Sequence, residues 1–325
     1  MIKSVLSVTL MSLLACHSTQ AKDAAANNST APKAGTLKIG VVMATYDDNF
    51  LTLLRRGIEK AGQTAGVTLQ IEDSKNEVGL QMNQIQNFVA TGVDAIIVSP
   101  VDTDATVGMS DAAQAAGIPL VYVNRQPINV DMLPDNQAFV ASNEVDSGTL
   151  QTREVCRLLK GKGDVLVLMG ALTDQTGIQR TRDIHDVIAT PECAGMKIVE
   201  EQSGEWQRNK GNDIMTNWLS AGIHFDAVIA NNDEMAIGAI QAIKATGHVD
   251  MSKVVIAGVD ATADALAAMK AGDLDVTVFQ DAAGQGAGAV DAAIRLAKGD
   301  AVDQKVWIPF ELVTPANYGQ YLNRN

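Results

Sequence analysis

Histidine and cysteine, which build many catalytic and metal sites, are scarce in this sequence. Its 325 residues include four histidines and three cysteines, and no histidine has a cysteine or carboxylate partner at the spacing of metal ligands. A GxSxG elbow is lacking, and neither a GxGxxG nor a Walker loop follows the first strand-like segment. Asp233 and Asp260 are an alternative acid–base pair, but carboxylates that bind a ligand look the same. We therefore expect a protein that is not an enzyme and that holds no metal or cofactor.

Basic residues are also few. Lys and Arg number 25 against 38 Asp and Glu, which gives a formal net charge of −13. An acidic surface repels the phosphates of nucleic acids and anionic lipids. Neither nucleic acid nor a charged membrane surface is therefore expected as a partner.

Long apolar runs are confined to the N-terminus. The run of residues 5–15, preceded by Lys3, is too short to span a bilayer and has the length of a signal-peptide core. Residues 13–16 resemble a lipobox that ends at Cys16, and the rival interpretation is ordinary cleavage after Ala21. We expect residues 1–16 to be a signal peptide and residues 17–36 a polar tether too poor in large side chains to fold. The mature protein is then periplasmic, and lipid-anchored if Cys16 is modified.

Two cysteines remain after this segment, Cys156 and Cys193. An even pair in an oxidising compartment is consistent with one disulfide. Two independent buried thiols are an equally good explanation, because a sequence does not give the distance between them. Both alternatives stay open at this point.

From Leu37 onward, apolar strand-like runs alternate with amphipathic helical stretches. The alternation predicts two doubly wound α/β lobes with parallel sheets, and the chain is long enough for two cores. The glycine cluster at 284–288 lies within a helical pattern, which indicates close packing of that helix against a sheet. Strands are expected near 37–43, 67–73, 94–100, 118–124, 137–142, 164–169, 196–201, 226–231, 253–259 and 274–280, with helices that include 50–65, 77–91, 104–116 and 283–298.

Polar side chains directly follow five of these predicted strands. Parallel sheets bind ligands in the crevice beyond the carboxyl ends of their strands. Amide, carboxylate and guanidinium groups together supply the donors and acceptors that the hydroxyls of a sugar or polyol require. The set therefore favours recognition of a polyhydroxylated ligand. Its members are Tyr46–Phe50, Asn124–Gln126, Asn231–Asp233, Asp260 and Gln280–Asp281.

Single members of this set have simpler explanations. A strand-end residue such as Asn232 or Asp233 also caps the helix that follows it. Capping is the better explanation for any one residue, but not for five strand ends together with two arginines. Trp206 offers an indole face that stacks on a sugar ring; the alternative is a core or surface tryptophan, as we assume for Trp218 and Trp307. Its position alone leaves Trp206 undecided.

The chain resembles the periplasmic sugar-binding proteins of the ribose and galactose type that serve ABC transporters. The resemblance runs from about 37 to 315 and is carried by the segments 230–236, 257–260, 180–182 and 124–126. It implies the type I fold, in which two lobes joined by a three-strand hinge close on the ligand. Transcriptional repressors related to this family carry a basic helix-turn-helix before the first strand. In this chain the predicted signal peptide and tether occupy that position, so a repressor is not expected.

The resemblance also implies a site, lobe limits and partners. One lobe would comprise 37–139 and 282–309, and the other 140–281 and 310–325. The partners would be a small polyol or sugar and the membrane permease of an ABC transporter, and the protein would be a monomer without a cofactor. The implied ligand-binding residues are Asp48, Phe50, Asn124, Arg125, Arg180, Trp206, Asn232, Asp260 and Gln280.

Two departures from the ribose-binding pattern bear on the ligand. Asn124-Arg125 replaces Asp-Arg, and 48–51 reads Asp-Asn-Phe-Leu where an asparagine precedes two aromatics in ribose binders. The segments 47–52 and 306–313 look like the inositol- and rhizopine-binding branch. We therefore expect myo-inositol as the ligand. The alternatives are a pentose or hexose of the ribose or xylose type, and a sensor that presents its ligand to a chemoreceptor or kinase.

Overall fold

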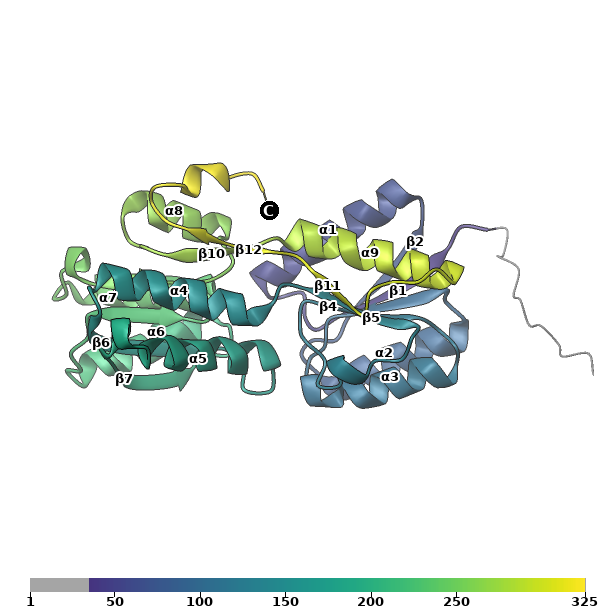
Figure 1. Cartoon of the computed structure of the whole chain (residues 1–325), viewed down its shortest axis with the longest axis horizontal. Helices are drawn as coiled ribbons and strands as arrows, with labels where there is room; N and C mark the ends of the chain where they lie inside the picture. The colour runs from purple at the N-terminus through teal and green to yellow at the C-terminus, as the bar shows by residue number, and fades with distance from the viewer. Residues whose placement is uncertain (1–34, 325) are drawn as a thin grey trace, which may run out of the picture. The chain divides into compact units, whose positions relative to one another are not determined.

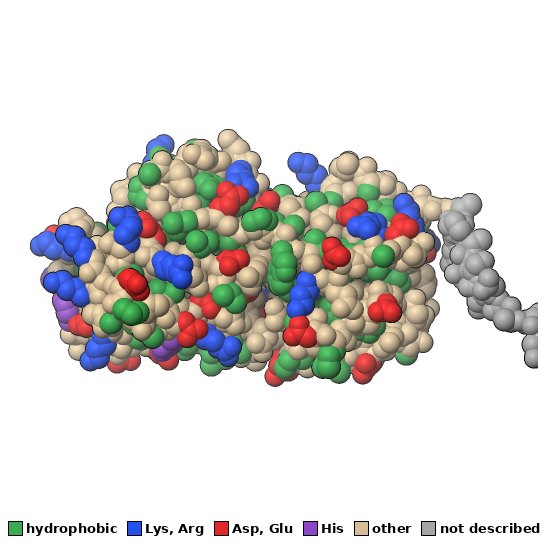
Figure 2. Space-filling model, viewed as in Figure 1, with side chains coloured by type: hydrophobic (Ala, Val, Ile, Leu, Met, Phe, Trp, Pro, Cys, Tyr) green, Lys and Arg blue, Asp and Glu red, His purple; other side chains and the backbone are tan. Residues whose placement is uncertain are grey.

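The computed structural model describes residues 35–324 (Figure 1). The predicted signal peptide, with Cys16, and most of the predicted tether lie outside these residues. Within them, no helix combines the length and the apolar character needed to cross a membrane. On the face seen in Figure 2, acidic and basic side chains are interspersed over both lobes, and hydrophobic side chains lie singly or in small groups.

The first lobe is built on a six-stranded parallel sheet with the order β11-β5-β4-β3-β1-β2. Helices cover both of its faces, α1 and α9 on one and α2 and α3 on the other (Figure 1). Adjacent residues such as Val41 and Val42 therefore enter different cores. The strands are β1 Lys38–Met43, β2 Thr68–Asp73, β3 Ala95–Val98, β4 Leu120–Val123, β5 Gln137–Ala141 and β11 Lys305–Trp307, and the helices are α1 Asn49–Ala65, α2 Val78–Thr91, α3 Thr106–Ala115 and α9 Ala282–Lys298.

The second lobe repeats this plan on a four-stranded parallel sheet with the order β7-β6-β8-β9. Helices α4 and α5 pack on one face, and α6, α7 and α8 on the other. The predicted α/β fold with a parallel sheet in each lobe is thus confirmed. The strands are β6 Lys162–Met169, β7 Gly195–Ser203, β8 Ala227–Ala230 and β9 Val255–Ala257, and the helices are α4 Glu144–Leu158, α5 Gln175–Ile188, α6 Arg208–Ser220, α7 Asp233–Thr246 and α8 Ala263–Ala271.

One strand differs from the expectation that all strands join the two parallel sheets. Strand β10 (Thr277–Gln280) pairs antiparallel with β12 (Phe310–Val313). Two isolated parallel bridges, Ala257 with Val276 and Asp260 with Phe279, connect this segment to β9 and the residues after it. The φ angles of Asp260 and Ala261 are 121° and 52°, so the backbone after β9 leaves the extended conformation that a continuous ladder needs. The strands expected from the apolar runs do not include β11, of three residues, or β12, of four residues.

Three segments of the chain cross between the lobes, and they are called the three connections from here on. They are residues 142–143 between β5 and α4, residue 281 between β10 and α9, and residues 308–309 between β11 and β12. The lobe limits given above stay a prediction, although each lies within two residues of one of these connections. Within residues 35–324, short 3-10 helices also occur in the loops. These are Thr103–Ala105, Val130–Met132, Pro191–Cys193, Met251–Lys253 and Tyr318–Gln320.

A disulfide holds the end of α4 in place, and close glycine contacts do the same for α9. Cys156 and Cys193 form a disulfide with a Cα–Cα distance of 5.7 Å, which selects the first of the two alternatives and ties the end of α4 to the loop before β7. A disulfide of this kind contributes about 2–4 kcal/mol. In the glycine cluster, a Cβ on Gly286 would lie 2.6 Å from the backbone nitrogen of Ile58 in α1. The glycines therefore allow α9 to approach a helix and, at Gly288, also Val140 of the sheet.

Candidate ligand-binding site

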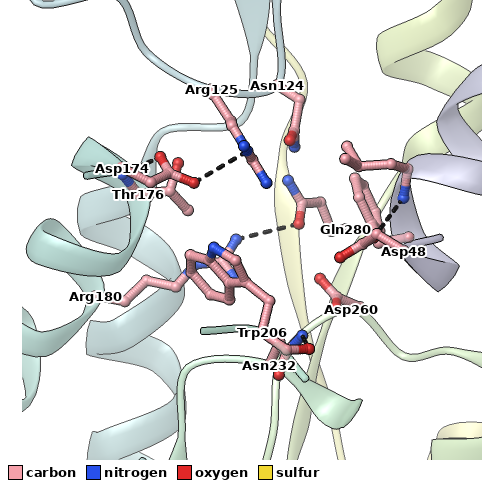
Figure 3. Close-up of a pocket in the computed structure, with 12 residues that line it drawn as sticks. Asp48, Asn124, Arg125, Asp174, Thr176, Arg180, Trp206, Asn232, Asp260 and Gln280 are labelled. Carbon is pink, nitrogen blue, oxygen red and sulfur yellow. Dashed lines mark hydrogen bonds and ion pairs between the residues drawn. The ribbon is translucent and has the colours of Figure 1, made fainter. Parts of the chain in front are cut away.

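A pocket of about 330 Å³ lies between the carboxyl ends of strands from both lobes (Figure 3). All nine residues predicted from the sequence lie in its wall. The lining residues are Asp48, Phe50, Leu51, Asn124 and Arg125 from the first lobe and Asp174, Thr176, Arg180, Trp206, Asn232, Asp260 and Gln280 from the second.

Asp48 occupies the N-cap of α1 at the first-lobe wall. Its Oδ1 accepts a hydrogen bond from the Leu51 amide at 2.7 Å, as an N-cap residue does. The Phe50 amide also acts on this carboxylate, and the remaining lone pairs can accept from a ligand. Burial raises the pKa of the Asp48 carboxyl above its usual range, with the Arg125 charge acting in the opposite direction. Phe50 and Leu51, which are buried in the first turn of α1, supply the apolar part of this wall.

Asn124 and Arg125 follow β4 directly. Asn124 has a φ of 68°, a left-handed conformation that asparagine tolerates better than most residues. Its Nδ2 donates to Oε1 of Gln285 at 3.3 Å. The Arg125 guanidinium donates through Nη1 to the Pro100 carbonyl at 2.9 Å, and its Nε lies 3.1 Å from Oδ2 of Asp174. Because Asp174 belongs to the second lobe, this buried ion pair bridges the two lobes across the pocket (Figure 3).

Arg180, on α5, is almost fully committed to protein partners. Its Nε donates to Oε2 of Glu144 at 2.7 Å, and Nη2 donates to Oε1 of Glu144 at 3.2 Å and to Oε1 of Gln280 at 3.1 Å. Nη1 donates to the Asn231 carbonyl at 2.7 Å. A guanidinium has five N–H donors, so one remains for a ligand. Its charge is largely balanced by Glu144.

The six-membered ring of the Trp206 indole lies against the backbone at Gly170. A Cβ at position 170 would be 2.2 Å from Cη2 and Cζ2 of the indole, so only glycine permits this approach. Glu205 and Trp206 have φ angles of 50° and 69°, which turn the chain so that the ring enters the pocket wall. The Arg180 guanidinium carbon lies 5.7 Å from the ring centre, within the range of a cation–π contact.

Asn232 combines capping with a place in the pocket wall. Its Oδ1 accepts from the Met235 amide at 3.1 Å, and its Nδ2 donates to the Trp206 carbonyl at 3.1 Å. The capping alternative considered for Asn232 is therefore confirmed, and the same side chain also anchors Trp206. Much of its hydrogen-bonding capacity is used in this way.

Asp260 contributes a buried carboxylate. The structure gives this carboxylate no hydrogen-bond donor among residues 35–324. Burial raises the pKa of Asp260 well above its usual range, and the positive charge of Arg180 only partly opposes this effect. A buried carboxylate without donors is costly until a ligand supplies them.

Sequence reasoning missed Asp174 and Thr176. Asp174 caps α5 through the Thr176 amide at 2.9 Å and also faces Arg125. Both residues follow β6 in the chain, so the rule that identified the other strand ends applies here as well. The strand-end set omitted them because four residues separate Asp174, and six separate Thr176, from the end of β6 at Met169.

Asp233, next to the pocket residue Asn232, gives a prediction about pH. Its carboxylate is fully buried and accepts from Thr262 N at 2.9 Å and Thr277 Oγ1 at 2.7 Å, and burial raises its pKa to about 7. Between the unfolded value near 3.8 and about 7 only the folded form holds the proton, so stability is lost as pH rises, by about 1.4 kcal/mol per pH unit. We expect the melting temperature to fall by about 2–4 °C per pH unit from this group between pH 5 and 7.

The Asp233→Asn variant removes this contribution, together with the part of the raised pKa of Asp260 that the Asp233 charge causes. It keeps the oxygen that accepts from Thr262 and stays neutral at every pH. Its melting temperature measured from pH 5 to 8 should fall less steeply than that of the wild type, and it should be the more stable form at pH 8. Identical slopes for the two proteins would contradict the assignment.

Comparison with known proteins identifies the family. The sequence profile described as "Periplasmic binding protein domain" matches residues 39–301. The chain belongs to this family. This periplasmic binding protein is 65% identical over 298 residues to a protein of Rhizobium meliloti named for rhizopine binding, with 91% of this chain and 96% of the relative covered. Family membership implies a periplasmic location and confirms the prediction of a binding protein rather than an enzyme.

Two solved structures resemble this periplasmic binding protein closely. An ABC transporter solute binding protein from Bacillus halodurans with bound myo-inositol has a TM-score of 0.84 at 40% identity and covers 90% of this chain and 99% of its own. The Caulobacter myo-inositol binding protein bound to myo-inositol has a TM-score of 0.80 at 26% identity and covers 90% and 97%. Both confirm the type I fold that the sequence predicts.

Proposed function

We propose that this protein captures a cyclic polyol, myo-inositol or a near derivative, in the pocket and delivers it to the permease of an ABC importer. The observation that carries this proposal is a pair of carboxylates, Asp48 and Asp260, that line the pocket from opposite lobes. Each retains lone pairs without a protein donor, so each can accept hydrogen bonds from ligand hydroxyls. A ring that carries hydroxyls around its whole edge satisfies both walls at once.

The charges of the wall favour a neutral ligand over an acidic one. Asp174 balances Arg125 at 3.1 Å, and Glu144 balances Arg180 at 2.7 Å. The two pocket carboxylates that remain would repel a phosphate or a carboxylate group. Sugar acids and sugar phosphates are therefore expected to be excluded.

The apolar surfaces of the pocket fit a flat ring. Trp206 presents an aromatic ring in the second-lobe wall and Phe50 lies in the first-lobe wall. Aromatic rings pack on the C–H faces of cyclic polyols while polar groups bind the rim. The two relatives whose structures contain myo-inositol support a cyclitol over a pentose.

Delivery requires closure of the lobes, docking on the permease and export. A ligand that contacts both walls stabilises the closed arrangement by its differential affinity for it. We propose that the closed protein acts as a monomer, that it is exported by the segment 1–16, and that Cys16 anchors it by a lipid. The nine pocket residues predicted from the sequence are proposed as its ligand contacts.

A thermal-shift panel tests the function. Ligands that bind the folded form raise its stability, by about 2.7 kcal/mol at a hundredfold excess over Kd. We expect myo-inositol to raise the melting temperature most, ribose and xylose little, and glucuronate and inositol monophosphate not at all. Stabilisation by ribose or xylose without myo-inositol would overturn the cyclitol and keep a sugar importer. Stabilisation by the anionic compounds would contradict the charge argument.

A further inference from the structure

Two buried residues that do not line the pocket hydrogen-bond to residues that do. Glu144 is 7% exposed and holds the Arg180 guanidinium at two positions, 2.7 Å and 3.2 Å. Gln285 is fully buried and accepts from Asn124 at 3.3 Å. Neither residue is among the proposed ligand contacts. Their other partners show what they connect.

Arg180 contacts a residue beside each of the three connections. Glu144 is the first residue of α4, directly after 142–143, and Gln280 is the last residue of β10, directly before 281. Phe310 is the first residue of β12, directly after 308–309, and its ring centre lies 5.8 Å from the guanidinium carbon. One buried cation therefore gathers the second-lobe ends of all the connections, although these residues are far apart in the chain.

Gln285 has the corresponding place on the first-lobe side. It lies in the first turn of α9, which begins directly after residue 281. Its Nε2 donates to Oγ of Ser142, within another of the connections, at 3.0 Å. Its Oε1 accepts from Asn124, which lines the pocket. The amide thus joins a pocket residue to two of the connections.

We propose that Gln285 and Glu144 are positioning residues of the binding site. They fix Asn124 and Arg180 to the ends of the three connections and so confine rotation of the lobes to residues 142–143, 281 and 308–309. Ligand affinity then depends on both residues through the fraction of the protein that closes correctly. This inference rests on the proposed function, since it concerns the same pocket.

The main test is Gln285→Met, which keeps the length of the side chain and removes its hydrogen bonds without leaving a buried charge. We expect the Kd for myo-inositol to rise about tenfold, as for loss of an ordinary buried hydrogen bond, mainly through faster release. Small-angle X-ray scattering of the unliganded variant should give a larger radius of gyration than the wild type. Glu144→Gln is the second variant, and should weaken binding at least as much, because Arg180 loses its paired charge.

The control is Gln137→Met. Gln137 is also buried in the first lobe, and its Nε2 donates to the Ser110 carbonyl at 2.9 Å, at the start of β5 and away from the connections. This variant should lose thermal stability as Gln285→Met does but keep the Kd and the scattering of the wild type. Equal Kd and scattering for the two methionine variants would overturn the positioning role. If the wild type bound no compound of the panel, the proposed function would fail, and the scattering of the unliganded proteins would still decide the positioning role.

Discussion

Gly170→Ala should weaken ligand binding by about a hundredfold while leaving the fold in place, as expected for the loss of a central tryptophan contact. The new Cβ would lie 2.2 Å from Cη2 and Cζ2 of Trp206, a distance that forces the indole out of its position. The ring cannot yield by rotating a flexible end, since the clash falls on the fused ring itself. Isothermal titration with the ligand identified by the panel measures the effect.

Gly79→Ala is the matched control for this substitution. Gly79 lies within α2, and a Cβ there meets no atom within 4 Å. Alanine in a helix is more favourable than glycine by about 0.5–1 kcal/mol, so this variant should bind normally and melt slightly higher. Trp206→Ala should cost about as much affinity as Gly170→Ala, and the double variant little more, because both changes remove the same contact. Normal binding by Gly170→Ala would show that the position of the indole is unimportant.

Asp260→Asn should change binding and stability in opposite directions. Hydrogen bonds to a charged group contribute about 1.5–3 kcal/mol, so we expect a loss of affinity of roughly 10–150-fold. The free protein should become more stable at neutral pH, because burial already disfavours the ionised Asp260 carboxyl. Titration calorimetry and thermal melting of the unliganded protein measure the two effects.

An exposed carboxylate provides the comparison for Asp260. The Asp291 side chain is 70% exposed on α9, so Asp291→Asn should alter neither binding nor melting measurably. A drop in both affinity and stability for Asp260→Asn would indicate a structural role instead of a ligand contact. Unchanged affinity would remove Asp260 from the site.

The sequence predicts where the site lies better than it predicts which hydrogen bonds the site residues make. The rule that ligands lie beyond the carboxyl ends of parallel strands needs only the order of strands, and it led to Asp48, Asn124 and Asp260. It does not show that Arg180 spends four of its five N–H donors on protein partners. Those partners include Glu144, 36 residues away, and Gln280, 100 residues away. Such contacts are set by tertiary packing, which no local pattern records.

The same distinction holds for the fold. Near-continuous apolar runs such as 37–43 predict buried parallel strands because helices cover both faces. The pairing of β10 with β12 could not be predicted, since a short strand carries no sign of its partner or direction. The disulfide between Cys156 and Cys193 could likewise not be predicted. It depends on how closely the ends of two helices approach each other, here 5.7 Å between the Cα atoms.

The three connections also constrain how this chain can be made. Strand β11 completes the first sheet and β12 pairs with β10 of the second lobe, and both lie after residue 304. Without residues 305–313, each lobe therefore lacks one strand. Neither lobe corresponds to a contiguous gene fragment, and a truncation before residue 305 would leave both lobes incomplete at once. Folding of both lobes thus depends on the single segment 305–313.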